Sequence, residues 1–164
     1  MMTSKTSDRI TISGVPPTFD QTELERRRAA RRNQYHMTSE SHYVARGEIA
    51  FEFLTNVIKL AQQGYELSSK YPVTTDPMSY HAHMRKPDLI QQADLEILDE
   101  QVKQEYIAWL ESEHARYKKL LTEQLLQAAE VKEKQKEEAK RAKLIDAIRA
   151  EVNEAYGEGV VIPY

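Results

Sequence analysis

The sequence predicts a mainly α-helical protein with a small α+β head, made of a helix and a short β-ribbon, and a long C-terminal helix with coiled-coil-like periodicity. Three observations favour this class. The 164 residues include only five Gly and six Pro, fewer than the turns of a β-sandwich need. The segment from Asp88 to Tyr156 contains neither residue type, and its apolar residues recur every three or four positions. Only residues 65–86 change to the two-residue period of a strand.

We expect three parts along the chain. Residues 1–37 form a basic N-terminal arm with a short Arg-rich helix, residues 38–128 form the compact head, and residues 129–164 form a projecting charged helix and an apolar tail. Residues 1–47 carry eight Lys and Arg against five Asp and Glu, whereas residues 48–164 carry fifteen against twenty-one. A basic front on an acidic body indicates charged partners rather than a particular fold.

The Arg-rich helix is predicted to start at Asp20 or Thr22 and to end near Gln34. Thr22 with Glu25 fits a capping box, in which each side chain satisfies a free backbone N–H of the first turn. The hydrogen bonds of a short isolated helix do not offset the free-energy cost of nucleating it, so this helix would be marginally stable without a partner. Its apolar side is small and consists of Leu24, Ala29 and Ala30.

A second helix is predicted to open at Ser39 or Ser41 and to stop at Gly64, since glycine accepts the left-handed conformation that ends many helices. It is the most hydrophobic element, with Tyr43, Ala50, Phe51, Phe53, Leu54, Val57, Ile58, Leu60 and Ala61 at helical spacing. We expect this helix to pack against aromatic residues of the long helix. The predicted core residues are Phe51, Leu54, Ile58, Tyr106 and Trp109.

Residues 65–86 are predicted to form a two-stranded ribbon that the second helix covers, because a lone hairpin is marginal in water. Asp76-Pro77 marks its turn. Alternation then places Met78, Tyr80, Ala82 and Met84 on one face and Ser79, His81, His83 and Arg85 on the other. A short alternation from Ile10 to Ile12 is a candidate third strand.

The long helix is predicted to begin at Pro87 and Asp88, with an acid near the positive end of the helix dipole, and to stop at Gly157. Its charged stretch, residues 130–143, has almost no apolar residue. Glu130 with Lys134 and Glu137 with Arg141 stand four apart in the favourable order. We interpret the stretch as a solvated helical strut; the alternative is a charged linker that frays or folds back into a hairpin.

A helix that extends beyond a small head needs a partner for its apolar face. We therefore expect a homo-oligomer, other protein subunits, or both. The predicted interface comprises Leu144, Ile145, Ile148, Val152, Tyr156, Val160, Val161, Ile162 and Tyr164. The last four form an apolar tail suited to strand addition or to a neighbour's groove, with a disordered end as the alternative.

Five arginines between residues 26 and 32 form the sharpest local feature. Guanidinium groups bind phosphate in a bidentate manner, which predicts salt-dependent contact with nucleic acid. The alternatives are contact with an acidic protein surface, of this chain or of a partner, and a solvated helix. The residues concerned are Arg26, Arg27, Arg28, Arg31 and Arg32.

The sequence contains few of the motifs that are typical of enzymes. It has no cysteine, no phosphate-binding loop, no nucleophile elbow and no HExxH. His81 and His83 share a strand face, with His42, His36 or His114 as third ligands, but this pattern is weak and Arg85 on that face opposes a cation. We expect no cofactor, no metal and no enzymatic activity.

No apolar run approaches the roughly 20 residues that span a bilayer, and no secretory signal is visible. We expect a location in the cytoplasm or within a large assembly, without membrane contact. The predicted function is a non-enzymatic assembly or adaptor role, scaffold-like or as an accessory subunit, and by analogy alone such proteins include components of virus particles. The alternative is a nucleic-acid-binding regulator that uses the Arg26–Arg32 helix.

Overall fold

The computed structural model describes residues 9–157, 159, 160, 162 and 163. The chain divides into two compact units, Thr18–Ser112 and the segments Met1–Pro17 with Glu113–Tyr164. The Arg-rich helix lies within the 18–112 unit. The predicted class is confirmed: a small α+β unit and one long C-terminal helix.

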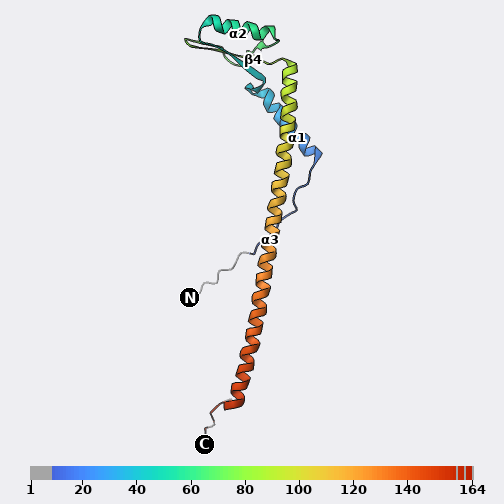
Figure 1. The fold of residues 1–164 in the computed structure, drawn as a ribbon, viewed down its shortest axis with the longest axis vertical. Helices are drawn as coiled ribbons and strands as arrows, with labels where there is room; N and C mark the ends of the chain where they lie inside the picture. The colour runs from blue at the N-terminus through green and yellow to red at the C-terminus, as the bar shows by residue number, and fades with distance from the viewer. Residues whose placement is uncertain (1–8, 158, 161, 164) are drawn as a thin grey trace. The chain divides into compact units, whose positions relative to one another are not determined.

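Four helices and four strands make up the described elements (Figure 1). In chain order they are α1 Gln21–Met37, the 3₁₀ helix η1 Ser39–Ser41, β1 His42–Gly47, α2 Ala50–Gln62, β2 Glu66–Leu67, β3 Thr74–Asp76, β4 Ser79–Arg85 and α3 Asp88–Tyr156.

Helix α1 starts at the first of the two predicted caps. Asp20 is the N-cap, and its Oδ1 accepts a hydrogen bond from the Thr22 backbone N at 2.9 Å, which satisfies one free donor of the first turn. The helix continues to Met37 rather than ending near Gln34. Tyr35 accounts for the extra turn, since its buried hydroxyl donates to the Asp94 carboxylate at 2.6 Å.

The predicted start of the second helix is wrong, because residues 42–47 form strand β1. This strand pairs antiparallel with β4 along its whole length, from His42 opposite Arg85 to Gly47 opposite Tyr80. The chain then turns back so closely that a Cβ at Gly47 would collide with the backbone of Phe53. Glycine at position 47 therefore permits the tight passage from β1 to α2.

The β structure is a four-stranded antiparallel sheet rather than a two-stranded ribbon. Strand β4 lies between β1 and β2, and β3 also pairs with β4. The β3–β4 hairpin turns at Pro77 and Met78, as predicted from the Asp-Pro signal, with Met78 at a left-handed φ of 62°. The predicted alternation holds for β4, whose Ala82 and Met84 are buried. Residues 10–12 form no strand.

One hydrophobic core lies between α2 and this sheet. Phe53 packs with Ala45, Ala82 and Met84, and Val57 and Leu60 border the cluster. The predicted core residues Phe51, Leu54 and Ile58 are wrong, with exposed fractions of 78%, 55% and 57%. Because each helical residue advances about 100°, positions 53, 57 and 60 share one side of α2 and positions 51, 54 and 58 share the other.

A second core joins α1 to the first part of α3. Leu24, Val102 and Tyr106 are buried together, with Leu110 at the edge. Tyr106 is confirmed as a core residue, whereas Trp109 remains 40% exposed. Trp109 stacks on Tyr106 with ring centroids 6.1 Å apart. The predicted contact of Trp109 with the second helix is therefore wrong, since these rings pack beside α1.

In the other unit, the N-terminal segment lies against α3. The backbone N of Ile10 donates to Gln127 Oε1 at 3.0 Å, and the Tyr117 hydroxyl donates to the Ser13 carbonyl at 3.2 Å. Ile10 and Ile12 are half-buried there. Their alternation thus serves packing on a helix rather than strand pairing.

The charged stretch 130–143 is helical throughout, so the helical strut is the correct interpretation and the hairpin is not. No ion pair joins Glu130 to Lys134 or Glu137 to Arg141 among the described residues. The helix here depends on residues of high helical propensity. Val161 and Tyr164 of the predicted tail interface lie outside the described residues.

A matched pair of substitutions in α2 tests which side of the helix is the core. Phe53→Ala should lower the free energy of unfolding by about 3–5 kcal/mol, because it empties a packed site. Phe51→Ala should change it by less than about 0.5 kcal/mol in dilute protein. Urea unfolding followed by circular dichroism measures both, and equal losses would contradict the assignment of the buried side.

Candidate interaction surfaces

The five arginines of α1 all meet carboxylates of the same chain. Arg26 forks onto Glu23 with 2.7 and 2.8 Å hydrogen bonds, and Arg27 reaches the same carboxylate at 2.7 Å. These bonds, from Arg26 first and Arg27 second, lower the pKa of Glu23 to about 2. Arg28 binds Glu25 at 3.1 Å. Glu23 and Glu25 are the acids that the sequence itself places within a helical turn.

Two further arginine partners come from outside α1. Arg31 forks onto Glu40 of η1 with hydrogen bonds of 2.7 and 3.2 Å, and Arg31 lowers the pKa of Glu40. Arg32 forks onto Asp99 of α3. The Arg28 Nε donates to the Asp99 backbone carbonyl at 3.3 Å. Bidentate geometry gives these contacts direction as well as charge, so they link α1 to α3 and to η1.

Arg27 also takes part in the second core. Its guanidinium carbon lies 4.6 Å from the centre of the Tyr106 ring and 5.0 Å from that of Trp109. Cations over aromatic faces are attracted to the ring quadrupole. An apparently hydrophilic helix thereby packs on α3 through long arginine stems, which explains how so few apolar residues suffice.

A polar triad stabilises the C-terminal end of α1. The Asp94 carboxylate accepts from the Tyr35 hydroxyl and, at 2.7 Å, from Lys86 Nζ. Burial and the bond to Asp94 raise the pKa of Tyr35. Burial opposes ionisation of Asp94, but the bonds from Lys86 and Tyr35 outweigh it and lower the pKa of that carboxyl. Near pH 7 the Asp94 carboxyl is therefore ionised and the Tyr35 hydroxyl is neutral.

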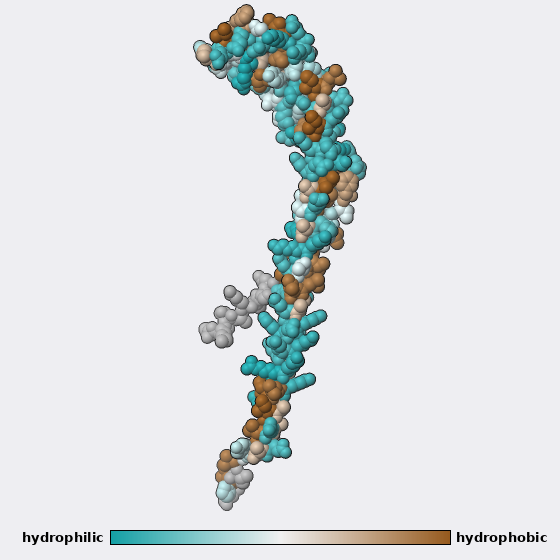
Figure 2. Space-filling view, in the orientation of Figure 1, coloured by the Kyte–Doolittle hydropathy of each residue, from teal (hydrophilic) through white to brown (hydrophobic). Residues whose placement is uncertain are grey.

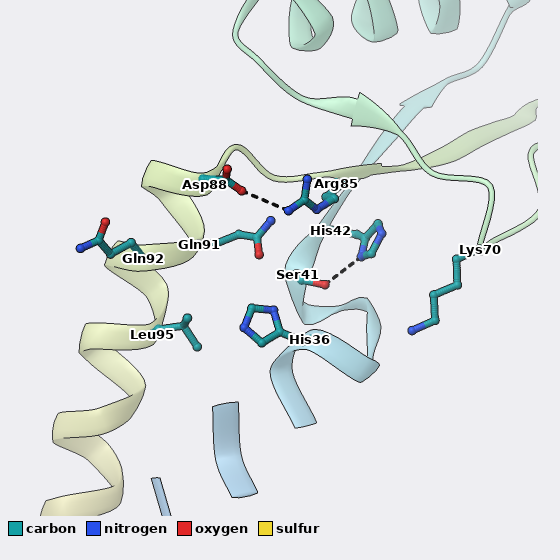
Figure 3. Close-up of a pocket in the computed structure, with 9 residues that line it drawn as sticks. All are labelled: His36, Ser41, His42, Lys70, Arg85, Asp88, Gln91, Gln92 and Leu95. Carbon is teal, nitrogen blue, oxygen red and sulfur yellow. Dashed lines mark hydrogen bonds and ion pairs between the residues drawn. The ribbon is translucent and has the colours of Figure 1, made fainter. Parts of the chain in front are cut away.

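A polar pocket of about 490 Å³ lies at the start of α3 (Figure 3). Several of its polar groups are held by hydrogen bonds to neighbouring residues. Arg85 donates to Asp88 at 3.1 Å, and Lys70 Nζ donates to the Met37 carbonyl at 2.6 Å. The two ring nitrogens of His42 lie 3.0 Å from the hydroxyls of Ser41 and Ser68. This arrangement is typical of a satisfied polar network rather than of an open set of reactive groups.

The predicted histidine pair does not gather further ligands in the described part of the chain. His81 bonds Thr74 through Nε2 at 3.2 Å, and His83 stacks on Tyr71 with ring centroids 4.5 Å apart. Among described residues, no three His, Asp or Glu side chains are arranged to hold a metal ion. The pair therefore contributes to packing on this face of the sheet.

The predicted C-terminal interface on α3 is helical and uncovered. Within the described chain, every residue from 128 to 157 is exposed. Leu144, Ile145, Ile148 and Val152 are between 40% and 60% exposed, and Figure 2 shows apolar side chains gathered near this end of α3 beyond a hydrophilic stretch. We call Leu144, Ile145, Ile148, Val152 and Tyr156 the C-terminal stripe. Val160 and Ile162 of the tail are also exposed.

Sequence patterns do not identify two of the acidic residues that bind the α1 arginines. Glu40 and Asp99 lie 9 and 67 positions from their partners, and nothing in the local pattern distinguishes them from other acids.

Comparison with protein-family models, curated proteins and solved structures finds no match. Within the described residues, no helix combines the length and the apolar character needed to cross a bilayer.

Removing the Asp99 charge tests the link between α1 and α3. Asp99→Asn should lower the free energy of unfolding by about 1 kcal/mol, because the Arg32 fork loses its charged acceptor. Glu66→Gln, at an exposed carboxylate 3.9 Å from Arg85, is the control and should stay within about 0.5 kcal/mol. Urea unfolding measures both; an Asp99→Asn value no larger than that of Glu66→Gln would argue against the link.

His42 should make stability fall in mild acid. Burial first, and then the charges of His83, Lys70 and Arg85, lower the pKa of His42 below its ordinary value of 6.5. The unfolded chain therefore binds this proton at a higher pH than the folded chain, so the free energy of unfolding decreases as pH drops below 6.5 and levels off below the folded pKa. His42→Gln should flatten this part of a pH–stability curve, and an unchanged slope would exclude His42 as its source.

Proposed function

We propose that this chain is a non-enzymatic assembly or adaptor protein that self-associates through α3 and docks other protein subunits with its terminal segments. The exposed C-terminal stripe carries the proposal. Apolar side chains recur on one side of a helix whose neighbouring residues are charged. A surface of this kind marks a contact with another protein.

The stripe has the spacing of a coiled coil. Ile145 and Val152 take the a positions of a heptad, and Ile148 and Ala155 take the d positions. Both a residues and one of the two d residues are β-branched, and β-branched residues at a and d favour trimers and tetramers over dimers. The preceding a and d positions hold Glu138 and Arg141, so the apolar seam covers two heptads. A seam this short supports association that depends on protein concentration.

The tail adds a second kind of contact. Val160 and Ile162 are exposed and belong to no helix or strand. An extended apolar segment can add a strand to another protein's sheet edge or fill a groove. This supports docking to a different subunit, as distinct from the self-association through α3.

The pairing of the α1 arginines supports a protein-packing role over nucleic-acid binding. A phosphate would have to displace a carboxylate that already forms bidentate hydrogen bonds to Arg31 or Arg32. The side chains of Arg27, Arg28 and Arg31 are at most one-third exposed. Arg26 is the most accessible of the five, and it shares Glu23 with Arg27.

Charges placed on the stripe test the proposed function. Ile145→Asp with Ile148→Asp should reduce the oligomer to monomer in light scattering of dilute protein after size exclusion, because repelling carboxylates would enter the seam. The matched control is Ala147→Asp with Ala150→Asp, which has the same spacing and charge on the opposite side of α3. The control should keep the oligomer, although Asp lowers helix propensity more when it replaces Ala.

A wild-type chain that is monomeric at every concentration would contradict self-association. Duplex DNA binding at low salt that weakens as salt is added, and that Arg26→Gln with Arg31→Gln abolishes, would favour the nucleic-acid alternative.

A further inference from the structure

Helix α2 has apolar side chains on two sides, and the chain covers one of them. Phe53, Val57 and Leu60 face the sheet. Phe51, Leu54 and Ile58 lie on the outer side and are exposed, and apolar side chains are visible at the surface over α2 (Figure 2). We define Phe51, Leu54 and Ile58 as the outer α2 face.

We propose that the outer α2 face binds the same face of a second copy of this chain, with the two helices antiparallel. Phe51 and Ile58 are two turns apart with Leu54 between them. A two-fold axis beside Leu54 therefore brings Phe51 of each copy against Ile58 of the other, and the two Leu54 side chains together. Self-complementary faces of this kind are the basis of two-fold dimers.

Charge complementarity favours a second copy in this orientation. Glu52 and Lys59 are seven residues apart on the same flank of the outer face. Antiparallel pairing places each Glu52 opposite the Lys59 of the other copy, whereas parallel pairing places like charges at the same level. Glu52 Oε2 accepts from the Glu48 backbone N at 3.0 Å, which orients this carboxylate, and its Oε1 can accept from another chain.

Other exposed apolar side chains lie on the strands that α2 packs against. Tyr43 and Leu67 are both in register with Met84, so they lie on the side of the sheet that carries α2. Both are exposed. Ile49, the N-cap of α2, is exposed as well. The contact remains small beside the roughly 800 Å² per partner of a standard interface, so we expect a weak dimer at high protein concentration.

The outer α2 face is distinct from the C-terminal stripe through which α3 is proposed to self-associate. Two different self-association surfaces on one chain allow an assembly to grow beyond the oligomer that either surface forms alone. The test is therefore made in the Ile145→Asp and Ile148→Asp background, so that failure of one proposal is distinguishable from failure of the other.

Cysteine cross-linking tests the orientation directly, since the chain has no cysteine of its own. Leu54→Cys, beside the proposed axis, should give a covalent dimer under mild oxidation. Ile58→Cys should give on the order of tenfold less, because its two copies would stand further apart than the roughly 7 Å Cα separation that a disulfide tolerates. Combining Phe51→Cys with Ile58→Cys should restore the covalent dimer.

A charge exchange provides the second measurement. Glu52→Lys alone should weaken the non-covalent dimer measured by sedimentation, and adding Lys59→Glu should restore it, because the double variant again pairs opposite charges. Equal cross-linking from Leu54→Cys and Ile58→Cys would overturn the antiparallel arrangement. Absence of any covalent dimer from Leu54→Cys in a folded variant would overturn self-docking and leave this face to a different protein.

Discussion

The sheet of the 18–112 unit offers α2 one apolar surface, and α2 carries apolar side chains on two sides. Packing resolves this excess by burying Phe53 against Ala45, Ala82 and Met84 and leaving Phe51 in solvent. A small unit has too little interior to bury every apolar side chain that its helices carry. The C-terminal stripe of α3, in the other unit, is exposed as well. The exposed outer side of α2 is thus a consequence of the small size of the core beneath it.

The arginines of α1 carry a chemical group that suits two kinds of partner. A guanidinium fork matches carboxylate and phosphate equally well, so the type of residue does not select the partner. The partner is selected by which acidic groups the fold brings close to each arginine. Asp99 and Glu40 lie within hydrogen-bond reach of Arg32 and Arg31, and α1 thereby packs on α3 with only Leu24 and Tyr35 fully buried. Hydrogen bonds and ion pairs help to hold α1 on α3, whereas apolar contacts hold α2 on the sheet.

Sequence patterns identify one of the two candidate surfaces, the C-terminal stripe, and do not identify the other, the outer α2 face. The C-terminal stripe followed from the heptad-like spacing of Ile145, Ile148 and Val152, which one helix determines without any partner in the chain. The outer α2 face could not be predicted, because positions 51, 54 and 58 are as apolar as positions 53, 57 and 60. Periodicity identifies an amphipathic helix but cannot choose between two apolar sides. That choice depends on where β1 and β4 place Ala45 and Ala82.

The sequence alone determined the helical class, the unbroken helix from Asp88 to Tyr156 and the alternating faces of β4, because propensity, the absence of Gly and Pro, and side-chain period are local properties. Packing between distant segments makes residues 42–47 a strand, turns Phe51 outward and brings Arg32 to Asp99. Each of these depends on contacts between residues far apart in the chain, and such contacts override weak local preferences.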